Sequence, residues 1–66
     1  MSHESYRVHA TVVVFNNGKL VIPAREEDGS SVGNILLNVR ARNYAAFGPS
    51  VDVRLSDVRE VPIRRY

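Results

Sequence analysis

Hydrophobic and polar residues alternate over residues 6–15, which read YRVHATVVVF. Every second residue from Tyr6 to Val14 is hydrophobic, and several of them are β-branched. Alternation of this kind predicts a β-strand with one buried face. Val13 and Phe15 are hydrophobic residues at positions where the alternation would place polar ones, so we expect the end of this strand to be covered on both faces.

The residues that follow predict a hairpin. Asn16-Asn17-Gly18 separates two hydrophobic runs, and Asn-Gly is a strong signal for a tight turn because both of its residues tolerate positive φ. We therefore expect a second, antiparallel strand from Lys19 to about Ala24. Pro23 has no backbone donor, so this strand is expected to lie at a sheet edge or to end there. Residues 26–33 then predict a polar loop, or a longer hairpin that turns at Asp28-Gly29.

The segment NILLNVRAR, residues 34–42, is compatible with two structures. As a helix it would begin with Asn34 as the N-cap and end at Gly48, with Pro49 just beyond. Helical spacing, however, scatters its hydrophobic residues around the whole circumference. As a strand it would bury Ile35 and alternate residues up to Ala41, and would point Arg40 and Arg42 outward. We favour the strand, followed by a helical turn over residues 44–47 that Gly48 closes.

The C-terminal part predicts two more short strands. Residues 51–55 alternate as VDVRL, Ser56-Asp57 can cap one short turn, and residues 61–64 form a last strand whose Pro62 again marks an edge. Five short strands favour an all-β fold, a small antiparallel barrel that is OB-like or SH3-like, because closure removes exposed edges. The alternative is an α+β fold of the order ββαββ. Either way we expect one domain over residues 1–66, with residues 1–5 as a flexible N-terminus.

Length and composition limit the kinds of function. With 66 residues and no cysteine, the chain has one small core that neither disulfides nor thiolate-bound metal can brace. A core of this size supplies only about 3–5 kcal/mol, so packing or self-association must hold the fold. The longest hydrophobic run, residues 12–15, is too short to span a bilayer, and residues 1–7 do not resemble a signal peptide. We therefore expect a cytoplasmic protein of bacterial or phage type that does not enter a membrane.

Catalysis and metal binding are not expected. The segment GSSVG, residues 29–33, lacks the Gly-Lys-Ser/Thr ending of a phosphate-binding loop. His3 and His9 have no carboxylates at the spacing of metal ligands, apart from Glu4 beside His3. No arrangement of Ser, His and Asp suggests a nucleophile. The sequence predicts no enzyme, no catalytic residue, no metal site and no cofactor.

The distribution of charge suggests a binding surface. The net charge is only +2, but the acidic residues Glu26, Glu27 and Asp28 form a cluster, whereas most arginines lie in the C-terminal half. Arginines hold phosphates and aromatic rings stack on bases, so an interleaved face is typical of proteins that bind RNA or single-stranded DNA. Tyr44 could instead help Phe47 to plug the barrel. The predicted nucleic-acid-binding residues are Arg40, Arg42, Tyr44, Arg54, Arg64, Arg65 and Tyr66.

The order of these features resembles a known family. Thr11-Val12 opens a strand, an Asn-Asn-Gly turn and an Asp-Gly turn follow, then Arg40-x-Arg42-x-Tyr44, Pro49, a Val-x-Val-x-Leu strand and a final Arg64-Arg65-Tyr66. From Thr11 to Tyr66 this order resembles the oligonucleotide-binding (OB) fold of bacterial translation initiation factor one and its relatives. The resemblance implies a five-stranded barrel with a helical turn between the third and fourth strands. It also implies RNA binding through Arg40, Arg42 and Tyr44.

Two further hypotheses remain open. The chain could be a protein-interaction or self-assembling module, for example a homodimer, because Val13, Phe15 and Leu36 add hydrophobic surface to otherwise polar faces. An arginine-rich surface could also reflect solvation alone, in which case the domain has a structural role and no defined ligand.

Overall fold

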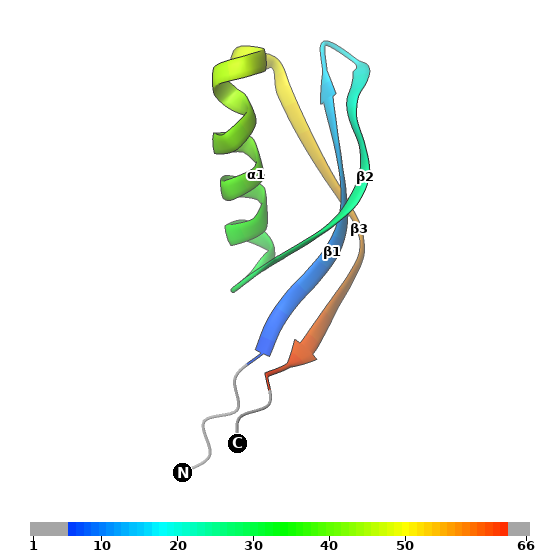
Figure 1. The fold of residues 1–66 in the computed structure, drawn as a ribbon, viewed down its shortest axis with the longest axis vertical. Helices are drawn as coiled ribbons and strands as arrows, with labels where there is room; N and C mark the ends of the chain where they lie inside the picture. The colour runs from blue at the N-terminus through cyan, green and yellow to red at the C-terminus, as the bar shows by residue number, and fades with distance from the viewer. Residues whose placement is uncertain (1–5, 64–66) are drawn as a thin grey trace.

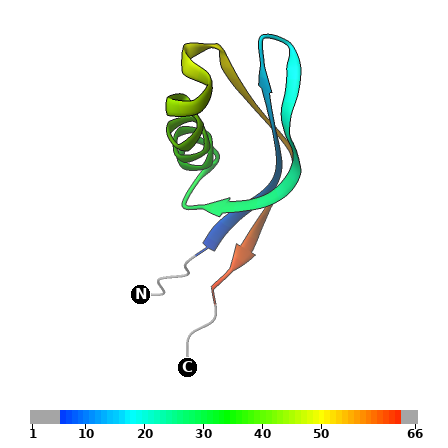
Figure 2. The same ribbon diagram turned by 45° about the horizontal axis from the view of Figure 1, so that its top comes forward.

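The computed structural model describes residues 6–63, which form a three-stranded antiparallel sheet and one helix. The elements follow in the order β1 (Tyr6–Asn16), β2 (Lys19–Gly29), α1 (Val32–Phe47), a 3-10 turn (Gly48–Ser50) and β3 (Val51–Pro62). The strand order in the sheet is β2-β1-β3, so both β2 and β3 are edge strands. The helix covers one face of the sheet, and no described element covers the other (Figure 1; Figure 2).

The predicted all-β barrel, whether OB-like or SH3-like, is wrong. The sheet is open, it has three strands rather than five, and a helix occupies the place of the expected third strand. The barrel that the family resemblance implied is therefore not the fold of this chain. The α+β alternative predicted the class of elements but one strand too many, since the order is ββαβ.

The hairpin prediction is confirmed. β1 begins at Tyr6, and the turn residues Asn17 and Gly18 have φ of 53° and 80°, as a tight hairpin turn requires. β2 is an edge strand, as Pro23 indicated. The loop predicted for residues 26–33 is wrong, because β2 continues to Gly29 and pairs with β1 as far as Val8.

The strand predicted for residues 34–42 is wrong, because local capping starts a helix there. Ser31 is the N-cap, and its Oγ accepts a hydrogen bond from the backbone N–H of Asn34 at 3.0 Å. The Asn34 side chain in turn accepts from the backbone N–H of Ser30 at 3.1 Å. The helix ends before Gly48, whose φ of 75° is left-handed and whose N–H bonds to the Tyr44 carbonyl. The helix therefore includes the helical turn expected over residues 44–47.

β3 is one strand where the sequence predicted two. The turn expected at Ser56-Asp57 is instead an irregularity within the strand, where the pairing with β1 shifts between His9 and Thr11. Asp57 has a φ of 52° and stays within the strand, as in a β-bulge. Pro62 ends this edge strand.

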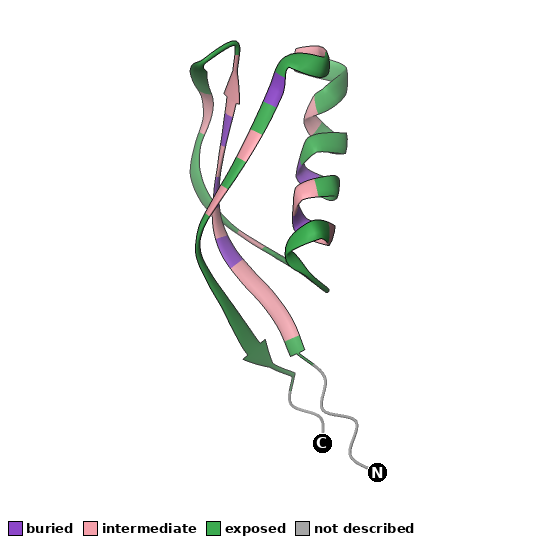
Figure 3. Ribbon diagram, turned by 180° about the vertical axis from the view of Figure 1, so that it is seen from behind, coloured by how far each residue is buried: buried purple, intermediate pink, exposed green. Residues whose placement is uncertain are grey.

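The core lies between α1 and the sheet. Alternate residues of β1 point toward the helix, where they pack against Ile35 and Val39 of α1. The rest of the helix surface is mostly exposed (Figure 3). Among the described residues, the buried hydrophobic side chains are Ala10, Val12, Val14, Ile35, Val39 and Val51. Every other described side chain that contributes to packing is only partly buried. The fold therefore depends on a single layer of core side chains between α1 and the sheet.

Candidate functional site

The sheet face opposite α1, which we call the open face, has no covering element in the described part of the chain (Figure 2). The strand registers place the odd-numbered residues of β1 on it, together with their cross-strand partners. Its residues are Arg7, His9, Thr11, Val13, Phe15, Leu20, Glu26, Asp28, Asp52, Arg54, Ser56, Arg59 and Val61.

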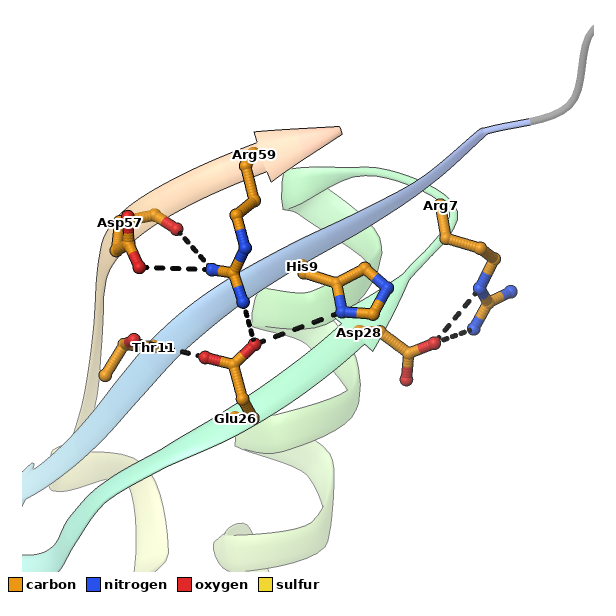
Figure 4. A network of polar contacts seen from close by, with 7 residues as sticks. All are labelled: Arg7, His9, Thr11, Glu26, Asp28, Asp57 and Arg59. Carbon is orange, nitrogen blue, oxygen red and sulfur yellow. Dashed lines mark hydrogen bonds and ion pairs between the residues drawn. The ribbon is translucent and has the colours of Figure 1, made fainter. Parts of the chain in front are cut away.

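A polar network centred on Glu26 occupies one half of the open face (Figure 4). Arg59 of β3 donates to the Oε1 atom of Glu26, and the Thr11 hydroxyl donates to the Oε2 atom at 3.3 Å. The Nδ1 atom of His9 lies 3.9 Å from Oε1. Arg59 also contacts the Asp57 carboxylate at 3.2 Å. One carboxylate on β2 is thus linked to side chains of both other strands, β1 and β3.

The other arginines of the open face are also paired within the chain. Arg7 donates through Nε and Nη2 to one oxygen of Asp28, at 3.1 and 3.0 Å (Figure 4). Arg54 donates to Asp52 at 3.0 Å, and its guanidinium carbon lies 4.8 Å from the centre of the Phe15 ring, a cation–π distance. Each arginine of the open face therefore already has a carboxylate partner.

This pairing affects which ligands the open face can accept. Arg7, Arg54 and Arg59 stand beside four carboxylates, those of Glu26, Asp28, Asp52 and Asp57. The face has no excess of positive charge to attract phosphates. Another protein surface can, however, cover this face without leaving an arginine unpaired, and an unpaired buried charge is the most destabilising case.

The arginines predicted to share one face do not do so. Arg40 and Arg42 are two residues apart in α1, which separates them by about 200° around the helix. Arg42 reaches back to β2, where its Nη2 lies 2.9 Å from the Oε1 atom of Glu27. Tyr44 is one turn from Arg40, and its side chain is 49% exposed. Arg40 and Tyr44 thus remain neighbours on the outer surface, while Arg42 belongs to a different flank.

The remaining predicted site residues are scattered. Arg54 lies on the open face, on the side of the sheet away from α1. Arg64, Arg65 and Tyr66 lie outside the described residues, as do residues 1–5. Tyr44 does not plug a barrel, since none is formed, whereas Phe47 packs against the core.

Sequence reasoning missed the network around Glu26. The sequence did predict that Arg7, His9 and Thr11 share the polar face of β1. Residues 26–29, however, were expected to be a loop. Glu26, Glu27 and Asp28 are all acidic, so the sequence carried no alternating pattern to show that β2 continues and presents Glu26 and Asp28 on the same face as the polar residues of β1.

Within residues 6–63 no group of three or more histidine and carboxylate side chains is placed to hold a metal ion. No helix of this part of the chain is long and apolar enough to cross a membrane. Comparisons with protein families, with curated proteins and with solved structures found no match for the chain.

Proposed function

We propose that this chain is a self-associating interaction module whose open face packs against the open face of a second copy. The observation that carries the proposal is the combination of an uncovered sheet face with charges that are already paired. Val13 and Phe15 stand in the middle strand of this face, and Leu20 is 54% exposed beside Phe15. Two such faces would form a sheet-on-sheet sandwich, a common way to bury the second side of a sheet.

The dimensions of the chain suit such an interface. The principal extents are 47 × 19 × 16 Å, and α1 lies beside the sheet along the 19 Å axis, so the open face covers about 750 Å² in projection (Figure 1). A stable dimer buries about 800 Å² on each partner. A twofold axis through the middle of β1, near Thr11, would bring the Glu26 networks of both copies to the centre and would place Val13 and Phe15 of each copy toward the two ends of the interface. The charges at the centre are already paired within each copy.

The experiment is sedimentation across micromolar to millimolar protein concentrations, with two matched variants. Leu20→Lys adds a charge on the open face, and Leu37→Lys adds the same charge at an exposed position on the outer surface of α1. We expect the parent chain and Leu37→Lys to form dimers, and Leu20→Lys to remain monomeric with an unchanged circular dichroism spectrum. A single-chain mass at every concentration would overturn the proposal. Loss of the dimer in Leu37→Lys alone would move the interface to the helix.

A second candidate is binding of single-stranded nucleic acid through the outer surface of α1. The observation in its favour is that Arg40 has no ion-pair or hydrogen-bond partner among the described residues and lies one turn from the half-exposed Tyr44. Such a pair can hold a phosphate and stack on a base. Titration of a labelled oligonucleotide at two salt concentrations tests it. Binding should weaken with salt and with Arg40→Gln, and absence of binding at low salt would remove this candidate.

A further inference from the structure

His9 stands on the middle strand of the open face, beside the carboxylate of Glu26. The Nδ1 atom of His9 lies 3.9 Å from the Oε1 atom of Glu26, and the imidazole is 32% exposed (Figure 4). The strand registers place Asp28 of β2 and Arg59 of β3 directly opposite His9. Histidine is the side chain that changes its charge between about pH 5 and 8. The charge of the open face therefore depends on pH.

The open face carries one carboxylate more than it has arginines. Two of its three arginines each pair with one carboxylate, whereas Arg59 is shared by Glu26 and Asp57. Three positive charges against four negative ones leave a net charge of −1 while the histidine is neutral. A proton on His9 brings this charge to zero.

The unmatched negative charge lies next to the histidine. The charged groups around His9 come from all three strands and are Arg7 of β1, Glu26 and Asp28 of β2, and Asp57 and Arg59 of β3. Arg7 is engaged by Asp28, and the single guanidinium of Arg59 serves two carboxylates. An imidazolium at the position of His9 is therefore the group that can supply the missing positive charge.

We infer that proton uptake by His9 strengthens the open-face dimer, an inference that rests on the proposed function because it concerns the same face. Two copies bring two unmatched carboxylates to the centre of the interface, where loss of water makes an unbalanced charge costly. A proton on each His9 balances that charge within its own copy. The dimer therefore binds protons more tightly than the monomer does. This stabilisation is present at low pH and is lost as the pH rises through the range in which histidine titrates.

The experiment is sedimentation at about pH 5.5 and about pH 8, at constant salt and over a range of protein concentrations. If each His9 holds its proton about threefold more tightly in the dimer, the dissociation constant should be about tenfold lower at the lower pH. His9→Gln should remove this pH dependence. His3→Gln removes the other histidine of the chain and should retain it.

Two glutamate variants test the charge balance itself. Glu26→Gln removes the unmatched charge, so its dissociation constant at about pH 8 should approach that of the parent chain at about pH 5.5. Glu60→Gln removes the same charge from the other side of the sheet, where Glu60 lies opposite Val8, and it should not tighten the dimer.

The outcomes separate this inference from the proposed function. A parent dimer that is equally strong at both pH values, or a pH dependence that survives in His9→Gln, would overturn the inference and leave the open-face dimer standing. Equal effects of Glu26→Gln and Glu60→Gln would also overturn it. A single-chain mass at both pH values would instead overturn the dimer itself, and the inference with it.

Discussion

Gly29, the last residue of β2, lies against the first turn of α1. A Cβ atom at this position would stand 2.9 Å from the Cγ1 atom of Ile35 and 2.5 Å from the Oδ1 atom of Asn34. The Asn34 side chain cannot move away freely, because it accepts the hydrogen bond from the Ser30 N–H. The absence of a side chain at Gly29 thus allows β2 to turn directly into the helix.

Gly29→Ala should therefore destabilise the fold by about 1–3 kcal/mol through overpacking. The measurement is urea or thermal unfolding followed by circular dichroism. Gly33→Ala is the matched control: it lies within α1, and the nearest atom to its added Cβ is the Ser31 Oγ at 3.9 Å. This control should stabilise the helix by about 0.5–1 kcal/mol. Equal effects of the two substitutions would contradict the close contact at Gly29.

Ser31→Ala tests the cap that starts the helix. Its hydroxyl satisfies the Asn34 N–H, which has no partner within the helix, so its loss should cost about 0.5–2 kcal/mol. Ser30→Ala is the control, since Ser30 contributes only its backbone N–H to this corner. Unfolding curves of the two variants should separate, and a Ser30→Ala effect as large as that of Ser31→Ala would show that the cap is misassigned.

The first hairpin was predictable because its signals are local. The alternation of β1 and the Asn17-Gly18 turn each specify a backbone conformation without reference to distant residues. The same is true of the helix end at Gly48 and of the edge position of β2 at Pro23. These features depend on φ preferences and on missing donors, which the residue type alone determines.

The helix was missed because its hydrophobic residues are not confined to the face that is buried against the sheet. Only Ile35 and Val39 are buried, whereas Leu37 is 70% exposed and Tyr44 points away from the sheet. In a strand, residues 35, 37 and 39 would share a face, and that coincidence favoured the wrong period. The high helix propensities of leucine, arginine and alanine in this segment were a signal for the correct structure.

The candidate site was less predictable than the fold. The open face depends on which side of the sheet the helix covers, and no local sequence pattern determines that side. Glu26 and Arg59 come together only because both edge strands flank β1, which is a property of the strand order. The charge pattern of the sequence could not show that most arginines of the described part of the chain have carboxylate partners.

A pair of alanine substitutions distinguishes the helix from the strand in solution. Ile35→Ala should cost about 2–5 kcal/mol, because the Ile35 side chain is 1% exposed and its loss leaves a cavity in the core. Leu37→Ala should change the free energy of unfolding by less than about 0.5 kcal/mol. A strand would bury both residues on one face, so similar losses from the two substitutions in unfolding experiments would contradict the helix.

The ion pair between Glu26 and Arg59 should contribute little to stability even though it joins the two edge strands. Both side chains are about half exposed, and water and salt screen such pairs. A double-mutant cycle with Glu26→Gln and Arg59→Gln should give a coupling below about 1 kcal/mol that falls as salt is added. The same cycle on Glu27 and Arg42 is the comparison, and it should retain more of its coupling in salt because the Glu27 carboxylate is better shielded from solvent. If the Glu26 cycle gave the larger and less salt-sensitive coupling in a monomeric sample, the open face would be less solvated than its geometry indicates.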